Sequence, residues 1–208
     1  MSDAAVAGSL TRVYLVRHGE TDWNALGRLQ GTIDVPLNAR GLAQARALAA
    51  RLRGVRFDAA YCSALGRARR TAALVLAGRR VPALEEPAFN EMSYGRWQGS
   101  TRTQLTRDDP ALAGRWEGDP WAVTFPGGES LADVGRRAVA AWQRVVAAHA
   151  GATVLVSAHG HVNRVLLVHA LALPRDRFWR IAQPNGACLV LDCDAAGLAA
   201  AAPPLAAA

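Results

Sequence analysis

Apolar strand-like segments alternate along this chain with segments of helical periodicity, and this alternation limits the fold more than any other feature of the sequence. Parallel strands need long crossovers, which helices supply, so the pattern predicts a three-layer α/β/α sandwich with a mostly parallel central sheet and helices on both faces. The predicted strands are residues 12–16, 57–63, 80–84, 153–157 and 187–192, and the predicted helices are residues 40–53, 65–77, 131–149 and 161–172.

Some stretches lack this regularity. Residues 85–128 contain tryptophans but show weak periodicity, so we predict an irregular segment there. Directly after it, Ser130 and Asp133 form the S-x-x-D pattern of a helix capping box. The 208 residues fit one domain, and we expect flexible tails at residues 1–10 and 198–208.

The composition excludes several classes of protein. Hydrophobic residues make up 51% of the chain and charged residues 20%, which excludes wholesale disorder, and no apolar run approaches the ~18 uncharged residues of a membrane span. The first residues carry Asp3 and no long apolar run, unlike a secretory signal. Cys62, Cys188 and Cys193 lack Cys-x-x-Cys spacing, which indicates free thiols. We therefore expect a cytoplasmic protein with no disulfide framework, no zinc site and no membrane partner.

The net charge of +7 raises the question of a nucleic-acid partner. All 24 basic residues are arginine, and they are scattered from Arg12 to Arg180 with one dense run at residues 67–70. Nucleic-acid binders tend to concentrate their charge on one face and to interleave stacking aromatics, so we predict no nucleic-acid partner. The excess of arginine still favours small anionic ligands.

Cationic side chains follow the carboxyl ends of three predicted strands. Arg17 and His18 come directly after the first strand, Arg67 lies a few residues beyond the second, and His159 follows the buried strand near the C-terminus. In open α/β sheets, ligands bind beyond the carboxyl ends of the strands, and a glycine beside each histidine permits close approach of the backbone. Because two guanidiniums can chelate a phosphoryl group, the sequence predicts a pocket for a multiply charged anion.

At these residues the sequence resembles the histidine phosphatase superfamily, also called the phosphoglycerate mutase-like family. The segments that carry the resemblance are "RHGETDWN" at 17–24, "QGTIDVPLNARGLAQA" at 30–45, "SALGRARRTA" at 63–72, "NEMSYGRWQG" at 90–99 and "VSAHGHVNRVL" at 156–166. They stand in the family's order and cover nearly the whole chain, which makes them far more specific than a lone R-H-G.

The resemblance implies phosphoryl transfer without a metal or another cofactor. His18 would attack phosphorus and form a phosphohistidine, for which its imidazole must be neutral. Arg17, Arg67 and His159 would hold the equatorial oxygens, and Asn24 would donate a further hydrogen bond. The phosphate-binding set implied in this way is Arg17, Asn24, Gln30, Gly31, Arg67, His159 and Gly160.

The resemblance also implies a catalytic carboxylate and shows two departures from the family pattern. Glu91 would protonate the leaving alkoxide and then activate water, and we expect partial enclosure to raise its pKa. Ala64 stands where an aspartate is common, so we expect Ser63 to cap the following helix. His161 stands where a small or amide-bearing residue is common, which would put a titratable group at the pocket mouth. A metal at His159 and His161 is not expected, because no third ligand stands near them.

The family includes both phosphatases and mutases. The segment between Glu91 and the helix at 131 is short, and "FPGGES" at 125–130 resembles the compact phosphatases, so we expect a phosphomonoester hydrolase acting on a small phosphorylated metabolite. A cofactor-dependent phosphoglycerate mutase is the alternative, and a low-turnover phosphate-binding interaction protein is a second one. The sequence leaves open the natural substrate and the oligomeric state, a homodimer included.

Overall fold

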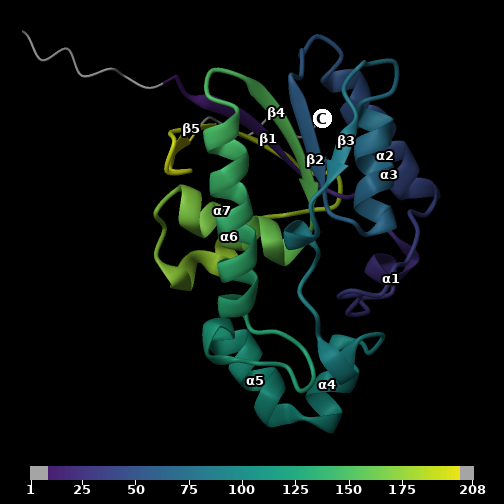
Figure 1. Cartoon of the computed structure of the whole chain (residues 1–208). Coiled ribbons are helices and arrows are strands. Elements are labelled where there is room, and N and C mark those ends of the chain that lie inside the picture. The colour runs from purple at the N-terminus through teal and green to yellow at the C-terminus, as the bar shows by residue number, and fades with distance from the viewer. Residues whose placement is uncertain (1–8, 202–208) are drawn as a thin grey trace, which may run out of the picture.

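The computed structural model describes residues 9–201, which form a six-stranded sheet covered by helices on both faces (Figure 1). The strands are β1 (Thr11–Arg17), β2 (Ala59–Cys62), β3 (Ala83–Glu85), β4 (Thr153–Ala158), β5 (Cys188–Cys193) and β6 (Ala199–Ala201). The helices are α1 (Asp22–Ala25), α2 (Ala39–Arg51), α3 (Gly66–Val75), α4 (Arg102–Asp108), α5 (Pro110–Gly118), α6 (Leu131–Ala148) and α7 (Gly160–Ala170), with 3-10 turns η1 (Pro87–Phe89), η2 (Gly95–Trp97), η3 (Pro120–Ala122) and η4 (Arg175–Arg180).

The sheet has the strand order β3-β2-β4-β1-β5-β6 and is mainly parallel, which confirms the predicted fold class. β1 pairs with β4, β4 with β2 and β2 with β3 in parallel, whereas β5 runs antiparallel to β1, and β6 antiparallel to β5. The three parallel pairs bring the carboxyl ends of β1, β2 and β4 to one edge of the sheet. Residues that follow these strands therefore meet there, although they are far apart in the sequence.

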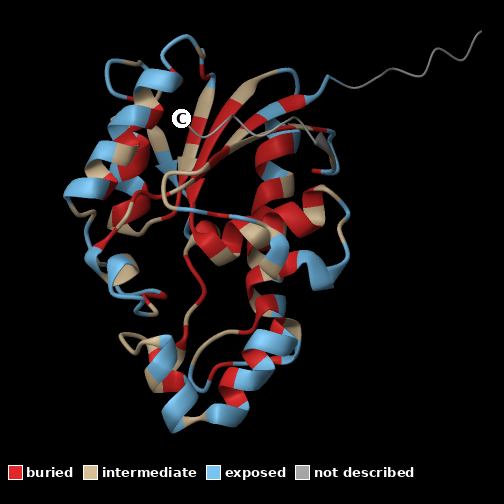
Figure 2. Ribbon diagram, turned by 180° about the vertical axis from the view of Figure 1, so that it is seen from behind, coloured by how far each residue is buried: buried red, intermediate tan, exposed pale blue. Residues whose placement is uncertain are grey.

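The two faces of the sheet are buried under different helices. In Figure 1, α2 and α3 lie on one side of the sheet, and α6 and α7 lie on the other. Val13, Leu15, Val154 and Val156 belong to the core under α6 and α7, whereas Leu155 points into the core under α2 and α3. Continuous apolar strands are typical of a parallel sheet covered on both faces, and Figure 2 shows the buried residues gathered on the strands and on the inward sides of these helices.

Helix starts confirm one capping prediction and correct another. Ser130 and Asp133 form the predicted capping box of α6. Ser63 does not cap α3, because Leu65 occupies the N-cap position and makes no side-chain hydrogen bond there. Both carboxylate oxygens of Asp34 instead accept the N–H of Gly66 at 2.9 Å, so the cap comes from a loop that is distant in sequence.

The segment predicted to be irregular contains two helices, α4 and α5. Thr101 and Gln104 form a capping box for α4, while Asp109 caps α5 and is followed by Pro110 in its first turn. Both helices are short and bury few apolar side chains, which is why helical periodicity is weak in this part of the sequence. They lie beyond the carboxyl ends of the parallel strands, at the bottom of Figure 1.

The prediction of a flexible tail at residues 198–208 is wrong for its first residues, because Ala199–Ala201 pair with β5 as strand β6. Strand pairing uses backbone groups, so an alanine-rich composition does not reveal it. The remaining residues of both predicted tails, apart from Ser9, Leu10 and Leu198, lie outside the described residues. Cys62, Cys188 and Cys193 are buried and free. Within residues 9–201, no helix has both the length and the apolar character to cross a membrane.

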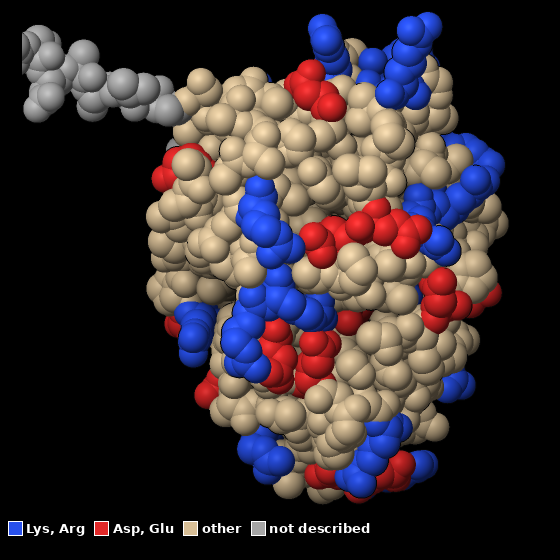
Figure 3. All heavy atoms as spheres, in the orientation of Figure 1, with Lys and Arg blue, Asp and Glu red and all other residues tan. Residues whose placement is uncertain are grey.

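Basic and acidic side chains lie next to one another on the face shown in Figure 3. Helix α6 carries the basic member of two ion pairs, Arg144 with Glu86 at 3.1 Å and Arg137 with Glu129 at 2.8 Å. The positive charge on this face is therefore locally compensated.

Candidate active site

A cavity of about 120 Å³ lies at the carboxyl edge of the parallel strands. The predicted site residues that line it are Arg17, His18, Asn24, Gln30, Gly31, Arg67, Glu91 and Gly160. His159 does not line the cavity itself but is fully buried beside His18, with the two ring centroids 5.1 Å apart. The structure thus brings all the predicted site residues together.

His18 follows β1 and is buried as a neutral imidazole. Its Nδ1 lies 2.7 Å from the carbonyl oxygen of Gly19, and a carbonyl only accepts, so Nδ1 carries the proton and Nε2 keeps its lone pair. Burial lowers the pKa of His18 well below its ordinary value, and the charges of Arg67 and Arg17 lower it further. A neutral ring with a free Nε2 is the form that a nucleophile requires.

His159 is held by a chain of polar groups behind the cavity. Its Nε2 lies 2.7 Å from Oγ of Ser63, whose hydroxyl donates to Oδ1 of Asn90 at 2.8 Å. Since that hydroxyl has already donated its proton, the serine oxygen accepts from Nε2–H of His159. Burial and the nearby Arg67 lower the pKa of His159 well below its ordinary value.

The two guanidiniums are oriented by backbone carbonyls. Arg17 donates from Nη1 to the carbonyl of Gln183, and Arg67 donates to the carbonyls of Ile33 at 2.9 Å and Gly31 at 2.7 Å. Among residues 9–201, neither guanidinium has a carboxylate within ion-pair distance. Their positive charges are therefore left to an anionic ligand.

Several buried polar atoms of the site lack a hydrogen-bond partner within the described part of the chain. They are Nε of Arg17, Nε of Arg67, Nδ1 of His159 and Oε1 of Gln30. Buried polar atoms are nearly always paired in folded proteins, so a cluster of unpaired donors and acceptors indicates a place for a bound ligand. The donor set suits a phosphoryl group.

Asn24 and Gly31 shape the wall of the cavity. Oδ1 of Asn24 accepts from Thr21 and, at 3.1 Å, from Nδ2 of Asn185, which also donates to the carbonyl of His18. These hydrogen bonds hold the side-chain amide of Asn24 through its oxygen and leave its NH₂ group out of them. Gly31 has φ 56°, and a Cβ there would lie 2.1 Å from Oε1 of Gln98.

Glu91 is oriented by hydrogen bonds to both carboxylate oxygens. Oε1 accepts from the amide of Met92 at 3.0 Å, and Oε2 lies 3.4 Å from the amide nitrogen of His161 and 3.5 Å from its Nδ1. Burial by itself would raise the pKa of Glu91, but the hydrogen bond and charge of His161, together with His159 and the amide of Met92, hold the pKa well below its ordinary value. The prediction of a raised pKa for Glu91 is therefore wrong.

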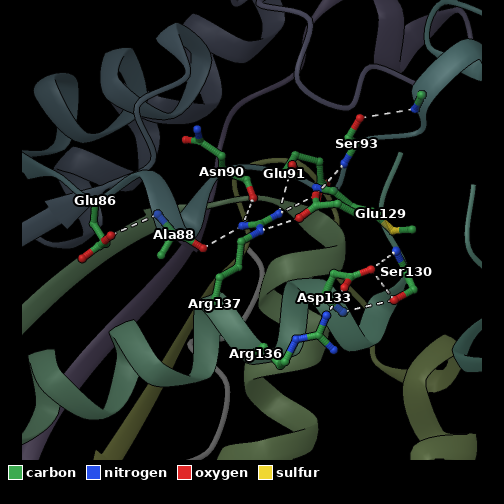
Figure 4. A network of polar contacts seen from close by, with 12 residues as sticks. Glu86, Ala88, Asn90, Glu91, Ser93, Glu129, Ser130, Asp133, Arg136 and Arg137 are labelled. Atoms are coloured by element: carbon green, nitrogen blue, oxygen red, sulfur yellow. Dashed lines mark hydrogen bonds and ion pairs between the residues drawn. The ribbon is translucent and has the colours of Figure 1, made fainter. Parts of the chain in front are cut away.

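Arg137 of α6 clamps the backbone that carries Glu91 (Figure 4). Nη1 donates to the carbonyls of Ala88 and Asn90, both at 2.7 Å, and Nη2 donates to the carbonyl of Glu91 at 3.3 Å. The same guanidinium pairs with Glu129, whose carboxylate accepts the amide of Ser93 at 2.9 Å. Sequence reasoning missed this clamp, because its contacts with backbone carbonyls leave no pattern in the side chains.

Other residues reach the cavity without having been predicted as part of the site. They are Arg28, Leu29, Tyr94 and Arg164. His161 was expected at the pocket mouth, and it does line the cavity. No group of three or more His, Cys, Asp or Glu residues that could hold a metal ion occurs within residues 9–201.

The chain belongs to the histidine phosphatase superfamily (branch 1), whose family profile matches residues 13–202. It is 35% identical over 182 residues to the adenosylcobalamin/alpha-ribazole phosphatase of Salmonella typhimurium, covering 87% of this chain and 90% of that protein. It is 39% identical over 162 residues to a 2,3-bisphosphoglycerate-dependent phosphoglycerate mutase of Methylobacterium radiotolerans, covering 74% and 76%. The structure of Bacillus stearothermophilus YhfR superimposes with a TM-score of 0.87 at 34% identity, covering 92% of this chain and 95% of that one.

Proposed function

We propose that this protein is a metal-independent phosphomonoester hydrolase that acts on a small phosphorylated metabolite through a phosphohistidine at His18. The observation that carries the proposal is a buried, neutral imidazole whose Nδ1 is held by Gly19, beside two guanidiniums that lack carboxylate partners among the described residues. This arrangement provides a nucleophile and the charge to receive a phosphoryl group.

In the first half-reaction, Nε2 of His18 attacks phosphorus while the bond between phosphorus and the alcohol oxygen breaks. The proton on Glu91 passes to the leaving alkoxide, and Arg17 and Arg67 balance the charge on the equatorial oxygens. A bound phosphate dianion repels the carboxylate and so raises the pKa of Glu91, which opposes the effect of His161. The same anion also raises the pKa of His159, and the ring then takes up a proton on Nδ1 and donates it to a phosphate oxygen.

In the second half-reaction, water replaces the alcohol. Glu91, now a carboxylate, takes a proton from the water as its oxygen bonds to phosphorus and the bond between phosphorus and Nε2 breaks. Inorganic phosphate leaves, and the neutral His18 and protonated Glu91 are restored. Both half-reactions use the same set of residues, so the cycle closes.

Two alternatives differ from this proposal in what happens to the phosphoryl group. A mutase would return the phosphoryl group to a second oxygen of the substrate. The similarity to the Methylobacterium phosphoglycerate mutase supports this alternative. A binding-only protein needs no proton donor, whereas Glu91 lines the cavity here. We favour the hydrolase because the segment between Glu91 and α6 is compact, with "FPGGES" leading directly into the helix.

The cellular setting is also part of the proposal. Three buried free thiols support a reducing compartment, and we propose the cytoplasm. A homodimer stays a prediction that analytical ultracentrifugation can test.

Turnover of two substrates tests the proposed function. Wild type and His18→Ala are compared on p-nitrophenyl phosphate and on 3-phosphoglycerate with its bisphosphate primer, each with a chelator present. We expect release of phosphate from the first substrate in wild type, resistant to chelator and lost in the variant. Isomerisation of the second with little phosphate released would instead identify a mutase, and tight phosphate binding without turnover would identify the binding protein.

A further inference from the structure

His161 occupies an enclosed position beside the catalytic cavity, in the first turn of α7. Its side chain is 16% exposed and lines the cavity. Aromatic rings from three parts of the chain surround it. Phe178 of η4 stacks on the imidazole with ring centroids 5.8 Å apart, and Trp116 of α5, Trp179 of η4 and Tyr94 have centroids at 5.6, 5.7 and 5.8 Å. This enclosure holds the ring in one orientation.

Nδ1 of His161 is shared between two groups. It lies 2.8 Å from the hydroxyl of Tyr94 and 3.5 Å from Oε2 of Glu91. The amide nitrogen of the same residue lies 3.4 Å from the same carboxylate oxygen. The other oxygen of Glu91 is held by Met92, so the orientation of the carboxyl group depends on His161 for half of its contacts.

The proton on Nδ1 determines which of the two neighbours it bonds. When Nδ1 carries a proton, it donates toward Glu91, which favours the carboxylate. When Nδ1 has only its lone pair, it accepts the O–H of Tyr94 and no longer donates toward Glu91, which removes a contact that favours the carboxylate. Burial raises the pKa of Tyr94 well above its ordinary value, so its hydroxyl remains available as a donor.

We propose that His161 is a positioning residue for Glu91, and that competition between Tyr94 and Glu91 for its Nδ1 sets the balance between the acid and the carboxylate forms of Glu91. The inference rests on the proposed function, because it assigns a partner to the proton donor of that reaction. It requires no step in which His161 touches the substrate.

The groups that face His161 come from several elements. The segment after η1 contributes Glu91 and Tyr94, β1 contributes Arg17 to the same cavity, and α5 and η4 contact the imidazole with indole and phenyl rings. On its own helix, Arg164 donates from Nε to the carbonyl of Ile181 and lies over the rings of η4. His159 precedes it by two residues and is buried with a lowered pKa. Because His161→Leu and His161→Asn remove the same imidazole, a difference between their pH profiles reports on Glu91.

The test is the pH dependence of kcat/KM for p-nitrophenyl phosphate and glycerol 3-phosphate in wild type, His161→Leu, His161→Asn and Tyr94→Phe. For His161→Leu we expect the limb that reports Glu91 to move to higher pH, because a donor to the carboxylate is lost. For Tyr94→Phe we expect it to move to lower pH, because the competing hydroxyl is lost. Asparagine keeps an N–H near Nδ1, so His161→Asn should lie closer to wild type than the leucine variant.

The two substrates distinguish a loss of Glu91 positioning from a general loss of activity. The alkoxide of glycerol needs a proton to leave, whereas p-nitrophenolate does not, so His161→Leu should reduce kcat/KM about tenfold or more on glycerol 3-phosphate and much less on p-nitrophenyl phosphate. A matched control is His149→Leu, since His149 also bonds a tyrosine hydroxyl, that of Tyr61 at 2.9 Å, but does not line the cavity. We expect its profile to match wild type.

The outcomes distinguish this inference from the function on which it rests. An active wild type whose variants lose rate equally on both substrates, with the limb unmoved, would overturn the inference and leave the hydrolase intact. A wild type that releases no phosphate from either substrate would overturn both. If His161→Leu does not fold, the opposite shift expected of Tyr94→Phe and the intermediate profile of His161→Asn still decide the matter.

Discussion

His18 and His159 lie with their ring centroids 5.1 Å apart because the residues just before them, Arg17 and Ala158, are paired in register on neighbouring parallel strands. Each histidine is thus the first residue beyond its strand at the same level of the sheet. A shift of one residue in this pairing would turn the side chains of β1 to opposite faces of the sheet, so the buried core fixes the geometry of the site.

The two buried neutral imidazoles predict that the protein loses stability on mild acidification. Burial, with the nearby charge of Arg67, lowers the pKa of His18 and His159 below the ordinary value of about 6.5. Below that pH the unfolded chain binds more protons than the folded protein, so the free energy of unfolding falls with the pH. Thermal melts between pH ~7.5 and ~5.5 measure this fall.

Two variants identify the groups responsible. His18→Ala should flatten the dependence, since it has one buried imidazole fewer. Glu91→Gln should keep the wild-type slope in this range, because the pKa of Glu91 is lowered and its contribution to stability is lost only in more acidic solution. A melting temperature of the wild type that stays constant from pH ~7.5 to ~5.5 would contradict the prediction.

The clamp of Arg137 predicts a loss of activity from a residue outside the cavity. The substitution Arg137→Lys keeps the positive charge. It removes the planar guanidinium that reaches three carbonyls and the carboxylate of Glu129 together. We expect a loss of about 1–3 kcal/mol in the free energy of unfolding, as for buried groups that lose their partners. We also expect kcat to fall by about tenfold, because Glu91 loses its orientation.

The neighbouring arginine provides the control for this variant. Arg136 is largely exposed and pairs only with Asp133 in the described part of the chain. Arg136→Lys should therefore leave both urea denaturation and kcat at their wild-type values. Equal effects of the two substitutions would show that the clamp does not position Glu91.

Gly31 predicts a coupled loss of stability and substrate affinity. Its φ is 56°, a Cβ would lie 2.1 Å from Oε1 of Gln98, and its carbonyl accepts from Arg67. Gly31→Ala should destabilise the fold and raise KM, because the Cβ collides with the Gln98 side chain and strains the backbone whose carbonyl holds Arg67. Gly27 has φ 64° but no atom within 4 Å of a Cβ, so Gly27→Ala isolates the conformational cost of about 1–2 kcal/mol. Both are measured by denaturation and kinetics, and equal KM values would argue against a role for the Gly31 carbonyl.

Local sequence patterns determined the layers of this protein and part of its cavity. Apolar runs and helical spacing depend on neighbouring residues, and the polar residues that follow the strand ends, Arg17, His18 and His159, can be read directly from the sequence. The same patterns failed to predict α4 and α5. These helices bury few apolar side chains, so helical periodicity in their sequences is weak, and packing stabilises them.

Tertiary structure alone decided the electrostatics and the support of the site. The pKa of Glu91 is lowered by His161, seventy positions further along the chain, and a cap for α3 comes from Asp34. Arg137 recognises backbone carbonyls, which every residue has, so no sequence pattern could indicate its role. Charge, burial and hydrogen bonding act through space, and they became defined only when the sheet brought these distant segments together.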